Sequence, residues 1–321
     1  MRARRVAPSF AIAAVLALAA GCDNSKSPPP SGDGGTAPTG WRAAVGAGGL
    51  FAQTFDDPAW TARQVTSGAL YSVACVGDSA GWVSGANGFV AHTLDGGATW
   101  STQDTHVHAA LYSVRFGTLA NGVVAGEAGT LAVTHDGGAT WALVPALTTA
   151  TLRGVTAAGD GQLMLAVGDL GTVLRSTDAG ATWSTSTLAD AGDLRAIALT
   201  PDAHLALAVD TRGAIWSSAD GGRTFAREAT APASLESIST SDDGELALAA
   251  GAGGTALVRS AGTWSTVALP ARADLHAALV ADHELYVGGD DGTLLGSEDS
   301  GGHWDVRALG TRAAIYGLDD L

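Results

Sequence analysis

Residues 111–141, LYSVRFGTLANGVVAGEAGTLAVTHDGGATW, contain the unit from which most of the chain is built. The unit has three short apolar runs, LYSV, GVVAG and TLAVT, and turn residues such as GEAG and HDGG bound them. Short runs rich in Val, Leu and Ala between glycine turns are typical of β-strands, and no sustained helical period is present. The unit therefore predicts antiparallel strands joined by hairpins.

The opening LYSV of this unit recurs along the chain at a nearly constant spacing of 40 to 42 residues. The copies begin at Leu70, Leu111, Leu152, Leu194, Leu235, Leu275 and Ile315. Four strands in a repeat of about 40 residues are the signature of a β-propeller blade. We name the strands A (the LYSV run), B (before the GxxG hairpin), C (after the hairpin) and D (after the Asp turn).

The two ends of the repeat array are incomplete in complementary ways. Residues 315–321 supply a strand A with nothing after it, and residues 41–69 supply strands B, C and D with no strand A before them. Joining the two ends gives a seventh blade and removes exposed strand edges. The prediction is an all-β fold over residues 41–321: a seven-bladed propeller of four-stranded antiparallel blades, closed by pairing of the N- and C-terminal segments.

A turn of the form S/T-x-D-x-G-x-T-W ends strand C in most units. Its carboxylate is suited to accepting backbone N–H groups, and its glycines permit positive φ. We interpret these aspartates as structural, not catalytic: Asp95, Asp136, Asp178, Asp220 and Asp299. The aromatic residue after the turn is expected to lie between blades with its N–H bonded. These residues are Trp60, Trp100, Trp141, Trp183, Phe225, Trp264 and Trp304.

The combined pattern, L-x-x-[VI], GxxG and [ST]-x-D-x-G-x-T-W, resembles the Asp-box (BNR) repeats of the photosystem II assembly and stability factor family. The resemblance covers residues 41–321, although nothing in this chain implies photosynthesis. It implies a non-catalytic binding or assembly scaffold for protein partners in the cell envelope, with no cofactor. The arginine-rich patch of the family is matched in part at most, because the thirteen arginines of this domain are spread out.

The N-terminus predicts export. A basic start is followed by an apolar stretch, residues 10–20, which is too short to span a bilayer as a stable helix. We interpret residues 1–21 as a signal peptide. The alternative is a plain secretory signal cut nearby.

The end of this signal resembles a bacterial lipobox, LAAGC, with Ala19 where leucine is usual. Cys22 is accordingly the predicted lipidation site, and residues 22–40, rich in Pro, Gly and Ser, are the predicted tether. The expected protein is an exported lipoprotein, anchored to a membrane of the bacterial envelope and facing the periplasm or the surface. The sequence does not decide between inner and outer membrane.

Composition excludes other classes of function. The formal net charge of −15 argues against nucleic acid, whose binders need a basic surface. His106 and His108 could face one metal ion, but no third ligand is indicated by spacing, so no metal is predicted. Cys75, in an apolar run, is expected to be a small buried residue. We expect a monomer.

The predicted binding site is a ring formed by the second residue of every strand A. This polar and aromatic ring is expected where the B–C hairpins and D–A loops open, and it consists of Tyr71, Tyr112, Arg153, Arg195, Glu236, His276 and Tyr316. Arg212, in a nearby hairpin, is expected to bring a third guanidinium group to the same sector. Arginine grips carboxylates in a forked geometry, so the predicted ligand is an acidic peptide segment of an envelope or membrane protein, with tyrosines supplying apolar contact.

Two alternatives stay open. The ring could line a water-filled channel, with its arginines paired to Asp169, Asp210 or Glu236. The protein could also bind or hydrolyse glycans, because sialidases and some endoglucanases use Asp-box propellers, and Tyr316 and Glu236 are suitable residue types. The F/Y-R-I-P segment of sialidases is missing, however, and their propellers have six blades.

Overall fold

The computed structural model describes residues 41–55, 59–281 and 283–320. These belong to one compact unit, Pro38–Leu321. The predicted signal peptide and the whole predicted tether, including Cys22, lie outside the described residues. Within those residues, no helix has the length and apolar character needed to cross a membrane.

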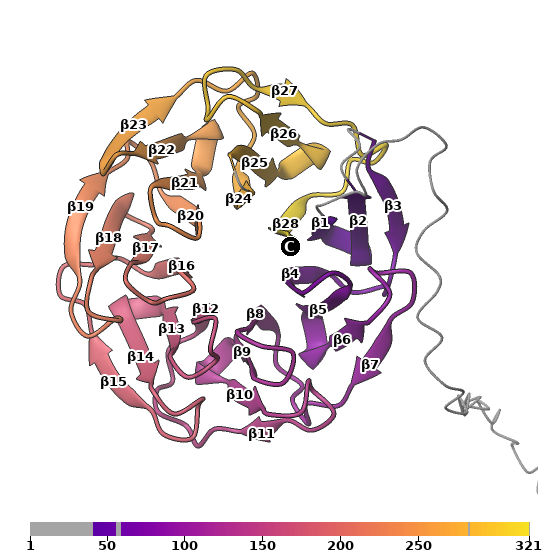
Figure 1. The fold of residues 1–321 in the computed structure, drawn as a ribbon, viewed down its shortest axis with the longest axis vertical. Helices are drawn as coiled ribbons and strands as arrows, with labels where there is room; N and C mark the ends of the chain where they lie inside the picture. Colours follow the sequence, from indigo (N-terminus) through magenta and orange to yellow (C-terminus); the bar gives the residue numbers. More distant parts are fainter. Residues whose placement is uncertain (1–40, 56–58, 282, 321) are drawn as a thin grey trace, which may run out of the picture. The chain divides into compact units, whose positions relative to one another are not determined.

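Seven four-stranded antiparallel sheets surround a central channel, which confirms the predicted fold (Figure 1). In each sheet strand A is innermost and strand D outermost. Blades 1 to 3 consist of β4 (Leu70–Val76), β5 (Ala80–Gly85), β6 (Val90–Thr93) and β7 (Ser101–Gln103); β8 (Leu111–Phe116), β9 (Gly122–Gly126), β10 (Leu131–Thr134) and β11 (Ala142–Leu143); and β12 (Leu152–Ala157), β13 (Met164–Gly168), β14 (Thr172–Ser176) and β15 (Ser184–Thr187).

Blades 4 to 6 continue around the channel in chain order. They consist of β16 (Leu194–Leu199), β17 (Ala206–Asp210), β18 (Ala214–Ser218) and β19 (Ala226–Thr230); β20 (Leu235–Thr240), β21 (Leu246–Gly251), β22 (Ala256–Ser260) and β23 (Thr263–Val267); and β24 (Leu275–Ala281), β25 (Glu284–Gly289), β26 (Leu294–Ser297) and β27 (Asp305–Val306).

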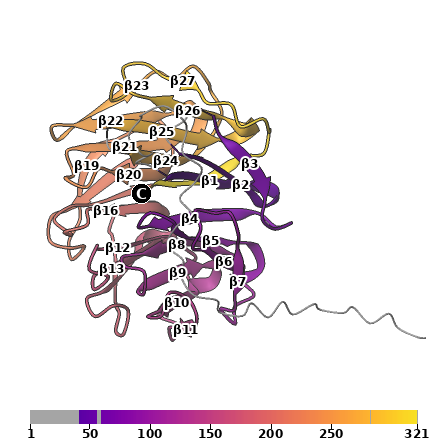
Figure 2. The same ribbon diagram turned by 45° about the vertical axis from the view of Figure 1, so that its right-hand side comes forward.

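The seventh blade, here called the closure blade, joins the two ends of the chain. Its strands are β28 (Ile315–Asp320), β1 (Trp41–Gly46), β2 (Leu50–Phe55) and β3 (Thr61–Gln64), in that order. Strand β28 pairs with β1 from Arg42↔Asp320 onward, and the two can be followed side by side in Figures 1 and 2. The predicted closure is therefore confirmed.

The hydrophobic core is divided into seven clusters, each built from two neighbouring blades. One of them contains Ile315 and Leu318 of β28 together with Ala277 and Leu279 of blade 6. Every blade thus buries both faces against neighbours, and the ring of blades has no uncovered sheet face between them. This packing holds the inner strands at fixed positions around the channel.

The Asp turns have the predicted structural role. In blade 2, Asp136 accepts hydrogen bonds from the backbone N–H of Thr140 at 2.8 Å and from the hydroxyls of Thr140 and Thr134. These bonds lower the pKa of Asp136 to about 2, the hydroxyl of Thr140 contributing most. The aromatic residues follow the prediction in part. Trp183 donates to the Gly180 carbonyl, whereas the buried indole nitrogen of Trp100 has no partner among the described residues.

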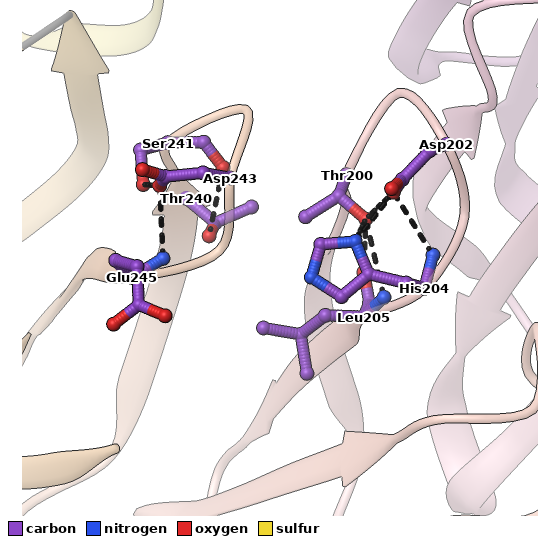
Figure 3. A network of polar contacts seen from close by, with 8 residues as sticks. All are labelled: Thr200, Asp202, His204, Leu205, Thr240, Ser241, Asp243 and Glu245. Atoms are coloured by element: carbon purple, nitrogen blue, oxygen red, sulfur yellow. Dashed lines mark hydrogen bonds and ion pairs between the residues drawn. The ribbon is translucent and has the colours of Figure 1, made fainter. Parts of the chain in front are cut away.

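Further aspartates close the A–B turns, and this use was not predicted. Figure 3 shows two neighbouring turns, from blades 4 and 5. Asp202 accepts from the Thr200 hydroxyl and the His204 N–H, and Asp243 accepts from the Ser241 hydroxyl and the Glu245 N–H. Much of the acidity is therefore turn chemistry.

Candidate functional site

A β-bulge lies at the second residue of every strand A. In blade 1, Leu70 pairs with Gly85 and Ser72 with Ser84, so Tyr71 is the extra residue. The other six inner strands shift register at the equivalent place. A bulge re-aims its extra side chain and is common beside functional sites. Here seven bulges carry the seven residues of the predicted ring.

All seven ring residues line one cavity of about 360 Å³ at the channel. Tyr71, Tyr112, Arg153, Arg195, Glu236, His276 and Tyr316 therefore share one site, as the register of the repeats predicted. Their role in binding stays a prediction.

Four of the ring residues form a continuous aromatic arc. The centroids of Tyr71 and Tyr112 are 5.2 Å apart, those of Tyr71 and Tyr316 5.9 Å, and those of Tyr316 and His276 5.5 Å. At one end of the arc, the guanidinium carbon of Arg153 lies 5.5 Å from the centroid of Tyr112. All four rings of the arc line the cavity.

In three blades the residue after the first glycine of the B–C hairpin is an acid that pairs with the ring residue. Arg153 donates to Asp169 through Nε at 2.6 Å and through Nη2 at 3.2 Å. The hydroxyl of Tyr112 donates to Glu127 at 3.0 Å; burial and this hydrogen bond raise the pKa of Tyr112.

Tyr71 and Tyr316 belong to blades whose hairpins place Ala86 and Ala47 at this position. Alanine cannot accept a side-chain hydrogen bond. Among the described residues, the hydroxyls of these two tyrosines have no hydrogen-bond partner. The middle of the aromatic arc is therefore the part of the ring that the protein leaves unsatisfied.

The remaining charges of the ring are balanced internally. Arg195 Nε lies 3.4 Å from Glu236 Oε2 across the boundary of blades 4 and 5, without hydrogen-bond geometry, so this buried N–H has no partner among the described residues. His276 Nε2 lies 2.9 Å from Asp290 Oδ1. The alternative expectation, that the ring arginines pair within the propeller, thus holds for both Arg153 and Arg195.

Arg212 does not join the ring, contrary to the expected convergence of three guanidinium groups. It is absent from the cavity lining and donates to the carbonyl of Asp190 at 3.2 Å. The cause is local. Its hairpin begins with Asp210 in place of glycine, and the buried carboxylate of Asp210 accepts from the N–H groups of Arg212 and Ala214 and from the indole of Trp216.

Further along the inner strands, the carboxylate of Asp319 links three blades. Asp319 of β28 accepts from Arg115 of blade 2 at 2.6 Å and from the backbone N–H of Cys75 in blade 1 at 2.7 Å. Cys75, expected to be buried, is half-buried and lines the cavity, and burial raises the pKa of its thiol. The residues of this cluster hold the closure strand.

The predicted histidine pair has no metal-site geometry. His106 Nδ1 lies 3.1 Å from Asp104 Oδ2, and no group of three potential ligands occurs in the part of the chain that the structure describes. Chemically, the cavity offers aromatic side chains and two tyrosine hydroxyls without a partner among the described residues. Such groups bind and orient a ligand.

Fold and cavity together define a seven-bladed Asp-box propeller with a ligand-sized cavity in its channel. The sequence profile of the family described as Photosynthesis system II assembly factor YCF48 matches residues 52–315. The chain belongs to this family.

Solved structures agree on the fold. One described as YCF48 bound to D1 peptide is 21% identical, with a TM-score of 0.61 over 75% of this chain and 83% of that chain. YCF48 from Cyanidioschyzon merolae is 15% identical, with a TM-score of 0.62 over 80% and 96%. An ancestral GH74 enzyme, also 15% identical, has a TM-score of 0.61 over 83% of this chain and 40% of its own. No curated protein sequence matches the chain.

Proposed function

We propose that this protein is a non-catalytic envelope lipoprotein whose channel ring binds a segment of an envelope or membrane protein during its assembly. The observation that carries the proposal is the set of seven bulges, whose extra residues, three Tyr, two Arg, one Glu and one His, all line one cavity. A bulge interrupts ladder pairing and re-aims a side chain, and bulges are common beside functional sites. Family membership and the related YCF48 structure with a D1 peptide support a protein ligand.

The likeness to a GH74 enzyme supports a second candidate, a glycan ligand or substrate. The ring favours it less. Glycoside hydrolysis needs a carboxylic acid and a second carboxyl group placed across the scissile bond. Glu236 is the one carboxylate of the ring, and Arg195 lies beside it. We therefore rank glycan binding second and hydrolysis third.

The test is site-specific photo-crosslinking in the native membrane. A photoreactive amino acid replaces Tyr71 in the ring or, as the control, the exposed Ser186 on β15 at the outer edge. We expect a polypeptide adduct from the ring position alone, mapped by mass spectrometry to one segment of an envelope protein. Equal labelling from both positions, or a glycan adduct, would refute the proposal.

A panel of fluorogenic glycosides tests the absence of catalysis. We expect no turnover. Turnover that disappears in Glu236→Gln would identify a hydrolase.

Attachment to the membrane is proposed from the sequence, with Cys22 as the lipidated residue. Two or more acyl chains give stable anchoring, whereas one chain is marginal. Mass spectrometry of the mature N-terminus should find acylated Cys22, and Cys22→Ser should release the protein from the membrane fraction. A free N-terminus at another residue would contradict lipidation.

A further inference from the structure

The charge around the cavity is predominantly negative. Of its lining residues, three are arginines and four are carboxylates: Arg115, Arg153, Arg195, Glu236, Asp242, Asp319 and Asp320. Three more carboxylates, Glu127, Asp169 and Asp290, bond or pair with ring residues. The whole chain carries −15. Long-range attraction toward this site therefore favours a cation.

One cationic side chain of the protein itself, Arg153, already lies against the aromatic arc. The guanidinium group of Arg153 lies over the Tyr112 ring, and Asp169 balances its charge. Aromatic faces attract such groups, and arginine stacks on them best because its charge is spread over a plane. The arc of rings is thus suited to holding guanidinium groups.

The next two rings of the arc, Tyr71 and Tyr316, offer similar aromatic surfaces, but among the described residues no arginine covers them. Tyr71 and Tyr316 lie 5.9 Å apart at a 42° angle, and no arginine of the described residues lies over either ring. Both tyrosines line the cavity, so a side chain that enters it can contact either ring. Their hydroxyls, which have no partner among the described residues, can accept hydrogen bonds from a guanidinium or ammonium group.

We propose that the cavity binds a basic side chain, arginine above lysine, of the partner segment on the faces of Tyr71 and Tyr316. This inference rests on the proposed function and names the chemistry of its ligand. An acidic segment is disfavoured because Asp169 and Glu236 already balance the ring arginines.

The experiment compares three labelled nonapeptides of Gly and Ser that carry two central arginines, two glutamates or two glutamines. Fluorescence anisotropy measures their binding to the full-length protein in mild detergent. We expect the arginine peptide to bind about tenfold more tightly than the glutamate peptide. Because an acidic protein attracts basic peptides over its whole surface, the decisive comparison is between variants.

Tyr71→Leu combined with Tyr316→Leu should weaken binding of the arginine peptide about tenfold. The matched pair Tyr71→Phe and Tyr316→Phe retains the ring faces and should lose about threefold or less. Phe55→Leu, at an exposed aromatic residue outside the cavity, should bind like the wild type. Circular dichroism melting confirms that each variant is folded.

Equal or tighter binding of the glutamate peptide would overturn the inference. So would unchanged binding of the arginine peptide to the folded leucine variant. If these results come with a ring-specific polypeptide adduct, the proposed function stands and its ligand is not basic. If the adduct is also absent, the proposed function fails as well.

Discussion

Removing residues 315–321 should abolish cooperative folding, because these residues form an inner strand. Strand β28 buries Ile315 and Leu318, which are 0% and 7% exposed. Burying two such side chains contributes about 3–6 kcal/mol together. Each ladder bond lost to β1 adds about 1 kcal/mol. The total is comparable to the whole net stability of a domain, about 5–15 kcal/mol.

A graded version keeps the strand and removes one side chain. Leu318→Ala should lower the free energy of unfolding by about 2–5 kcal/mol. Leu143→Ala, at a leucine that is 61% exposed, should change it by less than about 0.5 kcal/mol. Urea titration followed by circular dichroism measures both. A truncated chain that unfolds in one transition at the wild-type midpoint would refute the closure argument.

Two further predictions concern the Asp turns. Asp136→Ala should lower the melting temperature and leave partner binding unchanged. Ala139→Ser, at an exposed residue of the same turn, is the control. Normal melting with lost binding would show that the turn is a binding site. Hydrogen bonds, chiefly those from hydroxyls and from His303, lower the pKa of Asp136, Asp178 and Asp299 to about 2. Their stabilisation is therefore fully present above the ordinary carboxyl pKa of about 4 and is lost as pH falls toward 2. The urea midpoint of unfolding should fall as the pH is lowered from about 4 to 2, and it should fall less in Asp136→Asn. A midpoint that does not change over this pH range would contradict the stabilising role of these carboxylates.

The fold was predictable because the repeat supplies its own register. Once LYSV marks strand A, the unpaired ends of the array at residues 41–69 and 315–321 leave one way to complete a blade. The aspartates of the A–B turns were missed, although Asp202 and Asp243 share the short pattern [ST]-x-D-x-x-L, in which the hydroxyl residue two positions earlier bonds the carboxylate. Cys75 lies in an apolar run on an inner strand, one side of which lines the channel. The apolar character of a run does not show whether a given residue faces the channel or the core.

The sequence was sufficient to predict which residues form the ring, but not which of them pair with other side chains. The repeat places the second residue of each strand A at the same level of the channel. Its pairing depends on the hairpin of the same blade, where three blades have an acid, Glu127, Asp169 or Asp290, and three others have alanine. Arg212 had a warning signal, because its hairpin reads DTRG where most read GxxG. Without glycine at the first position the turn changes, and the side chain points to Asp190.

The closure blade also has a consequence for biogenesis. A ribosome makes β1 first and β28 last, and the pairing of Arg42 with Asp320 waits for nearly the whole chain. Until then the nascent propeller presents a bare inner edge, and an incomplete product keeps that edge permanently. A chain cut short by premature termination thus exposes the surface that proteases and chaperones recognise. The ring of blades therefore closes only in a chain that already contains all the preceding blades.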